Sequence, residues 1–324
     1  MNIKSLLLGS AVAAVAATGA RAADAIVIAE PEPMEYVRIC DTYGVGYFYI
    51  PGTETCMRIG GWVRYEIGTS DVLDGWSKLA RGRLEINTRN ESEWGTVAGY
   101  YRLDSRIING QGRQGDRDNR WDAQYSLGIG GLEMGFRDST WTRWFGYGGF
   151  TDWGGDYGFR ENHYISYTFA ADGFSGFVAL DHDDTGDYMP DLSAGLGGTF
   201  GMFEALGTIG YDESAEEFAL RGKLNADFGA FQARLAGFYA SGPNVYWSYG
   251  ASDWSVLLGL QASITEKTTA AVDLQYFDEG DWAVHGNLVH QIAPGLSALL
   301  EVRYYDYDAG GDSTAGFLRF QRSF

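Results

Sequence analysis

The chain has 324 residues and a formal net charge of −19, which argues against broad nucleic-acid binding, because that activity needs basic surface to neutralise phosphates. Glycine supplies 46 residues and proline only 6, while aromatic residues make up 15% of the chain. A helical protein avoids this much glycine inside its helices, so the composition favours an all-β protein of many strands joined by tight turns.

Residues 1–22 have the features of a secretory signal peptide. Lys4 precedes an apolar run at 6–17, and Ala20 and Ala22 form the small-residue pattern of a cleavage site. The alternative is a transmembrane anchor, but a spanning helix needs about 20 apolar residues. We therefore predict export with cleavage after Ala22.

Residues 23–56 are predicted to form an N-terminal extension, which contains the only two cysteines, Cys40 and Cys56. In an exported protein a lone pair is most simply a disulfide, and closing this loop would stabilise by roughly 3 kcal/mol in the chain-entropy model. A metal site is disfavoured, because the segment between the cysteines has no histidine and two thiolates alone do not form a zinc site. We expect no metal and no other cofactor.

From Met57 onward, apolar and polar residues alternate with a period of two, and one face of each segment lacks charge. The segments are about 10 residues long, which is the span of a tilted membrane strand, whereas globular strands average about 5–6. They predict a transmembrane β-barrel over 57–324. Sixteen segments show the pattern: 57–67, 79–89, 96–106, 120–129, 132–138, 162–169, 174–181, 192–199, 203–211, 217–227, 231–240, 253–263, 268–277, 282–291, 296–305 and 314–324.

The connections between these segments alternate in length. Short ones such as "GG", "AADG" and "APG" follow every second segment, and long polar ones such as "DHDDTGDYMPD" follow the others. An even strand number, short turns at one rim and long loops at the other is the plan of a bacterial outer-membrane barrel. The prediction is a 16-stranded antiparallel barrel with short periplasmic turns and long extracellular loops.

The chain ends on an aromatic residue instead of a polar tail. Leu318, Phe320 and Phe324 share the face predicted to meet lipid, so Phe324 would lie in the aromatic girdle of the closing strand. Arg322 falls on the same face, where an arginine can extend its charged end to the interface.

Three stretches carry a family resemblance: "MNIKSLLLGSAVAAVAA", "EPEPMEYVRICDTYGVGYFYIPGTETCMRIGGWVRY" and "FLRFQRSF". They resemble the alphaproteobacterial general porins of the Rhizobiales and Brucella type. The resemblance implies a homotrimer in the Gram-negative outer membrane, in contact with lipid and lipopolysaccharide, for passive diffusion of small hydrophilic solutes. It also implies a third extracellular loop folded into the lumen, and a C-terminal signal at Phe320 and Phe324 for the barrel-assembly machinery.

A barrel of sixteen strands is too wide to be filled by side chains, so we expect an aqueous channel. Arginines repeat on the inward face of the first strands and predict a basic pore wall; if the hairpins are symmetric, Arg64 lies opposite Arg83, and Arg83 opposite Arg102. The alternative is ordinary solvated charge. The predicted wall consists of Arg64, Arg81, Arg83, Arg102, Arg106 and Arg120.

The longest connection, 139–162, is rich in glycine and aromatic residues, unlike the acidic loops elsewhere. Exposed to water, its rings would form an aggregation-prone patch, so we predict that it folds inward and narrows the lumen. Packing at a subunit interface is the alternative. If the loop folds inward, Asp152 and Asp156 face the arginine wall, with Asp138 and Glu161 as further candidate acids.

No enzyme is predicted, because the four histidines have no catalytic or metal-binding spacing and no G-x-S-x-G, H-E-x-x-H or P-loop motif occurs. Two channel functions compete, a general diffusion pore and a porin specific for a sugar or an anion. Trp62, Tyr100 and Tyr305 could face inward and suit sugars, whereas the mixed charged lining favours the general pore. The acidic loops favour a weak preference for cations.

Overall fold

The computed structural model describes residues 38–324 except 72–74, 110–116, 156–157, 184–187 and 248–251, and the side chains of 117–119 are also not described. The predicted signal peptide lies outside the described residues. Residues Ile39–Phe324 form one compact unit. Within the described residues, no helix is long and apolar enough to cross a membrane.

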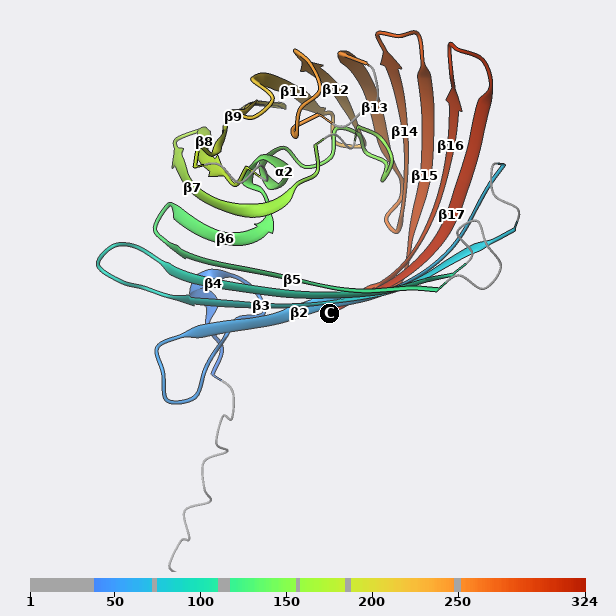
Figure 1. The fold of residues 1–324 in the computed structure, drawn as a ribbon. Helices are drawn as coiled ribbons and strands as arrows, with labels where there is room; N and C mark the ends of the chain where they lie inside the picture. The colour runs from blue at the N-terminus through green and yellow to red at the C-terminus, as the bar shows by residue number, and fades with distance from the viewer. Residues whose placement is uncertain (1–37, 72–74, 110–116, 156–157, 184–187, 248–251) are drawn as a thin grey trace, which may run out of the picture. The chain divides into compact units, whose positions relative to one another are not determined.

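Sixteen antiparallel strands of the described chain form a closed barrel, because the last strand pairs with β2 through partners such as Arg319 and Glu66. The strands follow one another around the wall in chain order (Figure 1). This confirms the predicted fold and strand number. The strands are β2 (Cys56–Ser70), β3 (Ser77–Asn90), β4 (Val97–Asn109), β5 (Arg117–Ile129), β6 (Leu132–Asp138), β7 (Glu161–Ala171), β8 (Phe174–Asp181), β9 (Asp191–Phe200), β10 (Phe203–Asp212), β11 (Glu217–Asp227), β12 (Phe231–Ala240), β13 (Trp254–Thr265), β14 (Thr268–Phe277), β15 (Trp282–Ala293), β16 (Leu296–Asp306) and β17 (Asp312–Ser323).

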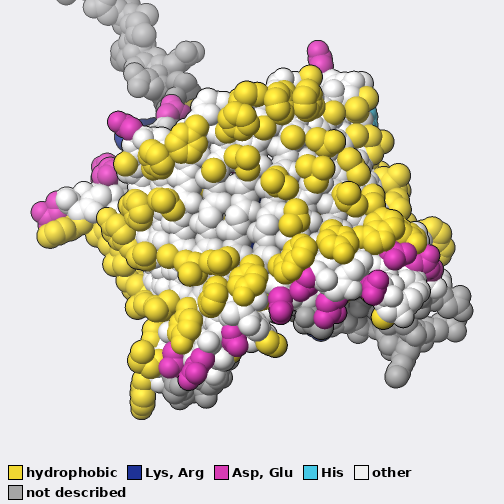
Figure 2. Space-filling model, turned by 90° about the horizontal axis from the view of Figure 1, so that it is seen from above, with side chains coloured by type: hydrophobic (Ala, Val, Ile, Leu, Met, Phe, Trp, Pro, Cys, Tyr) yellow, Lys and Arg dark blue, Asp and Glu magenta, His cyan; other side chains and the backbone are white. Residues whose placement is uncertain are grey.

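The outer wall carries the charge-free face of the alternation. Leu224, Leu235, Leu258 and Leu274 are cross-strand neighbours from β11 to β14, and each is about half exposed on the outside. Figure 2 shows that hydrophobic side chains spread over one face of the molecule, while acidic side chains gather at its edges. This pattern matches a wall surrounded by lipid and edged by polar rims.

Sequence periodicity did not predict the short strand β1 (Phe48–Tyr49) or the 3₁₀ turn η2 (Asp41–Tyr43). β1 pairs with the start of β2, and the predicted disulfide between Cys40 and Cys56 is present, with Cα atoms 6.0 Å apart. The Tyr43 hydroxyl donates a 2.8 Å hydrogen bond to Glu91, which follows β3 at the rim of short turns. The disulfide therefore fastens this segment to the first strand of the barrel.

We expect Cys40→Ser to loosen this segment while the barrel stays folded, because the cross-link joins a segment that precedes the wall to the first residue of β2, 16 positions later. The loss should be about 3 kcal/mol of local stability. Limited proteolysis of the purified protein should cut between Asp41 and Thr55 in the variant. Thr53→Ala, which removes two exposed turn hydrogen bonds, one to the Ile50 carbonyl and one from the Thr55 amide, is the control. Equal resistance of both variants would contradict the expectation.

Candidate pore constriction

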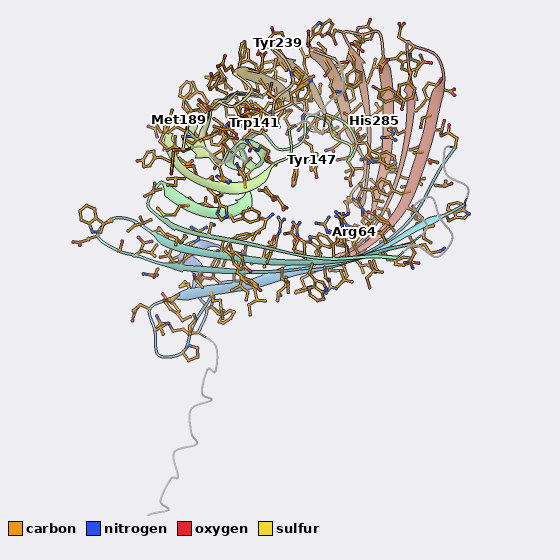
Figure 3. The ribbon with its side chains drawn as sticks, in the orientation of Figure 1. Arg64, Trp141, Tyr147, Met189, Tyr239 and His285 are labelled. Carbon is orange, nitrogen blue, oxygen red and sulfur yellow. A yellow bond between two sulfur atoms is a disulfide. The ribbon has the colours of Figure 1, made fainter. Side chains whose placement is uncertain are left out.

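The connection from β6 to β7 covers residues 139–160, and its described residues, 139–155 and 158–160, lie inside the barrel (Figures 1 and 3). It begins with helix α2 (Thr140–Phe145), whose N-terminus is capped because the Ser139 hydroxyl accepts a hydrogen bond from the Thr142 amide. A narrow hairpin follows, closed by backbone hydrogen bonds between Gly148 and Gly155 and between Gly149 and Gly154. We call residues 139–160 the inner segment.

Two carboxylates of the wall hold the tip of the inner segment, Phe150–Trp153. Asp273 of β14 accepts hydrogen bonds from the Phe150 amide at 3.1 Å, the Thr151 amide at 2.8 Å and the Thr151 hydroxyl at 2.6 Å. Glu301 of β16 accepts from the next two amides, each at 2.9 Å. Both side chains are completely buried, so four consecutive amides are satisfied by charged acceptors away from water.

The close approach of this tip to Asp273 requires glycine at two positions. A Cβ atom at Gly149 would lie 2.3 Å from Asp273 Oδ2, and one at Gly154 would lie 2.5 Å from the same atom. Any larger residue would push the tip off the carboxylate. The glycine content of this connection is therefore partly explained by contact with the wall.

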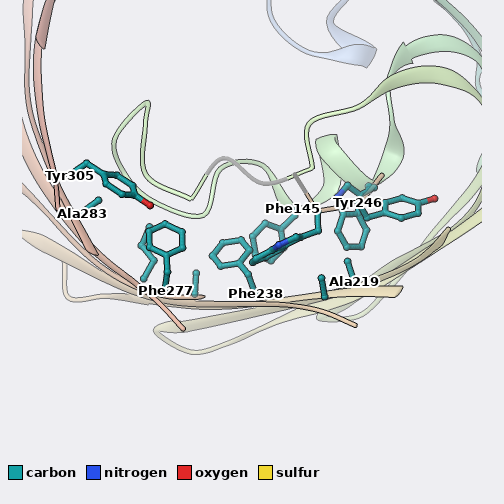
Figure 4. Packing of buried hydrophobic residues seen from close by; sticks show 12 residues of the cluster. Phe145, Ala219, Phe238, Tyr246, Phe277, Ala283 and Tyr305 are labelled. Carbon is teal, nitrogen blue, oxygen red and sulfur yellow. The ribbon is translucent and has the colours of Figure 1, made fainter. Parts of the chain in front are cut away.

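Aromatic side chains of the inner segment pack against the inner wall. Trp141 and Phe145 are buried in one cluster with Phe238 of β12 and Phe277 of β14, part of which is labelled in Figure 4. Tyr246, from the connection between β12 and β13, packs against Trp141 in a tilted arrangement with ring centroids 4.9 Å apart. Much of the apolar surface that the inner segment would otherwise expose to water is therefore buried inside the barrel.

Tyr246 also fixes the position of its own connection. It is completely buried, and its hydroxyl donates a 3.0 Å hydrogen bond to Asp181. Burial, followed by the negative charges of Asp181 and Asp191, raises the pKa of Tyr246 far above its ordinary value. The residue therefore remains a neutral donor, and it holds a second long connection against the inner segment.

Basic residues of the wall bind backbone carbonyls of the inner segment. Arg221 Nη2 donates a 2.7 Å hydrogen bond to the Trp141 carbonyl, Lys223 donates to Phe145, and Arg234 donates to Gly149. None of these bases, nor Asp273 or Glu301, was among the predicted site residues. Their position on the inward face was visible in the alternation, but their partners lie far away in the sequence.

The arginines of the predicted wall pair across the strands in a different register from the expected one. Arg64 pairs with Arg81 instead of Arg83, while Arg83 lies opposite Asp104, so the two expected pairs are wrong. The centre of each hairpin lies one residue away from the position that the two expected arginine pairs would require. Between β3 and β4 the centre is set by the two backbone hydrogen bonds that Ser92 and Gly95 exchange. Moving a centre by one residue moves each partner by two, which keeps every side chain on its predicted face.

The observed register produces a continuous row of arginines across four neighbouring strands. Arg64 lies opposite Arg81, Arg81 opposite Arg106, and Arg106 opposite Arg120. We call these four residues the arginine row. Arg83 and Arg102 lie on the same face nearer the short turns, where Arg102 is opposite Glu85.

The four candidate acids have different partners. Asp138 and Glu161 both bind Arg102, at 2.7 Å and 3.0 Å. Asp152 pairs with Arg319 of β17, at 2.5 Å, an arginine that was not among the six predicted. Asp156 lies outside the described residues.

A further acid connects the arginines to one another. Asp104 accepts hydrogen bonds from Arg81 and Arg83, each at 3.0 Å, and pairs with Arg102 at 2.9 Å. It was not predicted, although it occupies an inward position in the alternation. One carboxylate thus contacts three guanidinium groups.

A cavity of about 800 Å³ lies between this wall and the inner segment. Among the described residues, seven arginines and four acids line it, with Tyr147 and Phe159 contributed by the inner segment. Tyr147 is half exposed and points into the open lumen (Figure 3). Charge and open volume together give this part of the barrel the character of an aqueous passage.

The three aromatic residues expected on the inward face are there, but their rings are occupied. Arg64 lies over the Trp62 ring at 4.4 Å, and Arg137 lies over the Tyr100 ring at 3.7 Å. Tyr305 is buried, with its hydroxyl on Asp281. None of them presents a bare ring to the lumen.

The C-terminal aromatic residues lie on the outside of the barrel. Phe320 pairs with Tyr65 on the outward face, and Phe324, 61% exposed, exchanges backbone hydrogen bonds with Gly61. Arg322 donates a hydrogen bond to the carbonyl of Pro294 in a short turn. In the part of the chain that the structure describes, no three His, Cys, Asp or Glu side chains are grouped so that they could hold a metal ion.

Comparison with known proteins gives consistent matches along the chain. A family model described as "Porin subfamily" matches residues 24–317. Porin Omp2b of Brucella neotomae is 38% identical and porin Omp2a of Brucella canis is 40% identical, each over the full length of both chains.

Solved structures share the fold at low sequence identity. The outer membrane channel DcaP of Acinetobacter baumannii has a TM-score of 0.67 at 13% identity, covering 85% of this chain and 99% of that one. A triple mutant of the Rhodopseudomonas blastica porin has a TM-score of 0.59 at 12% identity, covering 83% and 100%. The chain therefore belongs to the porin subfamily, and it is a multi-pass β-barrel channel of the outer membrane.

Proposed function

We propose that the protein is a general diffusion porin, in which small hydrophilic solutes and ions pass between the inner segment and the arginine row. The observation that supports this most is the attachment of the inner segment to Asp273 and Glu301, which leaves the charged cavity on its other side. Family membership implies a channel rather than an enzyme. In this proposal the basic side of the passage consists of Arg64, Arg81, Arg83, Arg102, Arg106 and Arg120. Of the candidate acids, Asp138 and Glu161 lie beside Arg102 in the wall, Asp152 belongs to the inner segment, and Asp156 lies outside the described residues.

Single-channel recording in a planar bilayer tests this function. A general pore should give large steps whose conductance rises linearly with KCl concentration, because ions cross without saturating a site. Steps that saturate and are blocked by one sugar would instead support the substrate-specific alternative. The occupied rings of Trp62 and Tyr100 favour the general pore, since sugar-binding tracks need bare aromatic faces.

We also propose that the channel has a weak preference for potassium over chloride. Described acids such as Asp71, Asp253, Glu279 and Asp308 lie in the connections at the rim opposite the short turns and would attract cations at the entrance. The arginines of the cavity oppose this preference, so its size should be small. The sign of the reversal potential in a KCl gradient shows which ion the channel prefers. A reversal potential of the sign expected for a chloride-selective channel would overturn the proposed cation preference.

The assembly and the processing of the chain are further parts of the proposal. We propose a homotrimer, which should close in three equal steps in the same recordings, in contact with outer-membrane lipid and lipopolysaccharide. Residues 1–22 would be removed on export, leaving the extension 23–56 and the barrel 57–324. Phe320 and Phe324 would be read by the barrel-assembly machinery, and their exposure on the outside suits this role.

A further inference from the structure

We propose that the outward face of β2–β5 is the surface on which a second copy of this chain packs, and that the neighbouring copy closes an opening in the barrel wall beside β5. The proposal rests on the proposed function, because it names where the homotrimer would form its contacts. It also makes the neighbouring copy part of the wall of the passage.

β5 has a free edge along more than half of its length. It pairs with β4 from Arg117 to Ile129, but it pairs with β6 only from Tyr125 to Ile129. β6 ends at Asp138, where the chain turns into the barrel, and Figure 1 shows β5 continuing past this point. Among the described residues, no strand pairs with this edge of β5 from Arg117 to Gln124.

This free edge does not suit contact with lipid. Backbone N–H and C=O groups in hydrocarbon have no water to bond, so sheet edges in a membrane are closed or covered by protein. Side chains bridge the opening at one level, because Gln124 Nε2 donates hydrogen bonds to Asp138 and to Glu161, each at 2.7 Å. Beyond Gln124 no described strand covers the edge, and a second chain would do so.

The cavity of the passage reaches this edge. Arg120 and Asp122 line the cavity from the inward face of β5, and Trp121, which faces outward opposite Ser105, lines it as well. Trp121 is 67% exposed in a single chain. The wall of the passage is therefore incomplete beside β5, and a neighbouring copy would complete it.

An aromatic girdle marks the part of the wall that suits lipid. Aromatic side chains follow one another around the outside at the long-loop ends of β10–β16, each paired across strands or in ring contact with the next. Such rings lie at the headgroup level of a bilayer. The girdle consists of Tyr211, Phe218, Tyr239, Trp254, Tyr276, Trp282 and Tyr304.

The girdle does not continue over the described strands β2–β4. At their long-loop ends the outward residues are Thr69, Lys78 and Asn109, all exposed, while Trp76 precedes β3 and lies outside the strands. β2–β5 are also longer, with 13–15 residues against 10–12 in β10–β16. A bilayer needs only about 9–11 residues of each strand. Polar ends and extra length both suit a wall that faces another protein.

A second copy is the partner that fits this surface. In a closed cyclic assembly the same part of every copy faces the symmetry axis, so every free edge would be covered in the same way. Trp121, Tyr125 and Leu127 are each more than half exposed and would supply the apolar contact. Ser105, opposite Trp121, and Gly82, opposite Ser105, are small and would let another wall approach closely.

Spin labels at two outward glycines test the proposal. Gly82→Cys places a label on β3, and Gly237→Cys places one on β12, which carries the girdle; an added Cβ atom clashes with nothing at either position. Both native cysteines are joined in a disulfide and do not take the label. In vesicles that contain only the purified protein, the label on β12 should collide with oxygen dissolved in the hydrocarbon. The label on β3 should collide several-fold less often, because only a second copy can cover it there.

Trp121→Arg is a second test, read as the trimer band on unheated gels. The trimer should be lost, because an arginine at the contact would be buried without a partner. Tyr239→Arg is the control, since a charged group in the girdle can reach the headgroups, and its trimer should persist. Heat-modifiable mobility of each variant shows that its barrel is folded.

Equal oxygen accessibility of the two labels, or a stable trimer in the Trp121→Arg protein, would overturn the proposal. Conductance of the labelled proteins separates this failure from failure of the channel. A conducting channel with equally accessible labels would refute the contact surface and leave the diffusion function standing. A protected label on β3 in a protein without conductance would support the surface and refute the diffusion function.

Discussion

Replacing both carboxylates that hold the inner segment, Asp273→Ala together with Glu301→Ala, is expected to widen the channel. The four amides of Phe150–Trp153 would lose their acceptors at once. A hydrogen bond to a charged group contributes about 1.5–3 kcal/mol, so the tip would no longer be held against β14 and β16. The aromatic cluster around Trp141 would remain, because it lies at the other end of the segment.

The measurements are single-channel conductance and the swelling of proteoliposomes in sugars of increasing size. We expect larger and noisier conductance steps and faster entry of the largest sugars, because the released tip would move within the lumen. Each single variant should show a smaller change, since one carboxylate would still hold two amides.

Glu204→Gln is the control for the double variant and for both single variants. It removes a carboxylate from β10 that accepts a hydrogen bond from the Asn225 side-chain amide on the neighbouring strand. Its conductance should stay close to that of the wild type. If the double variant conducts and excludes sugars like the wild type, the two carboxylates do not determine the position of the inner segment.

The alternation in the sequence was sufficient to predict the barrel. A strand with lipid on one side and a polar lumen on the other must alternate along its whole length, so each of the sixteen strands was recognisable without its neighbours. The largest differences lie at strand ends, where β2 continues to Ser70 and β5 begins at Arg117. Those ends extend beyond the lipid-facing band, so no apolar face marks them.

Register and the partners of the inner segment were not predictable in the same way. Register depends on the turn, and the Ser92–Gly95 hydrogen bonds shifted the pairing by two residues while leaving each face unchanged. Asp273 and Glu301 lie more than 100 residues after the amides that they bind. A charge on an inward face predicts only a polar environment, and it does not reveal which distant backbone will fill it.

Leu235→Arg is expected to be the most destabilising single substitution on the outer wall. Leu235 lies at the middle of β12, 51% exposed, between Leu224 and Leu258 of the neighbouring strands. An arginine at the bilayer midplane of a barrel costs about 2–4 kcal/mol, because its charge must leave water or distort the membrane to reach it. The free energy of unfolding from lipid vesicles, measured by urea titration of tryptophan fluorescence, gives the cost.

Phe231→Arg is the matched control, because Phe231 lies on the same outward face at the short-turn end of the same strand. There the charged group can reach the interface, and the cost should fall to about 0–1 kcal/mol. A cost that depends on depth in this way would show that lipid surrounds β12. Equal costs at both positions would mean that Leu235 does not face the hydrocarbon core, and that this part of the wall is covered by protein in the assembled channel.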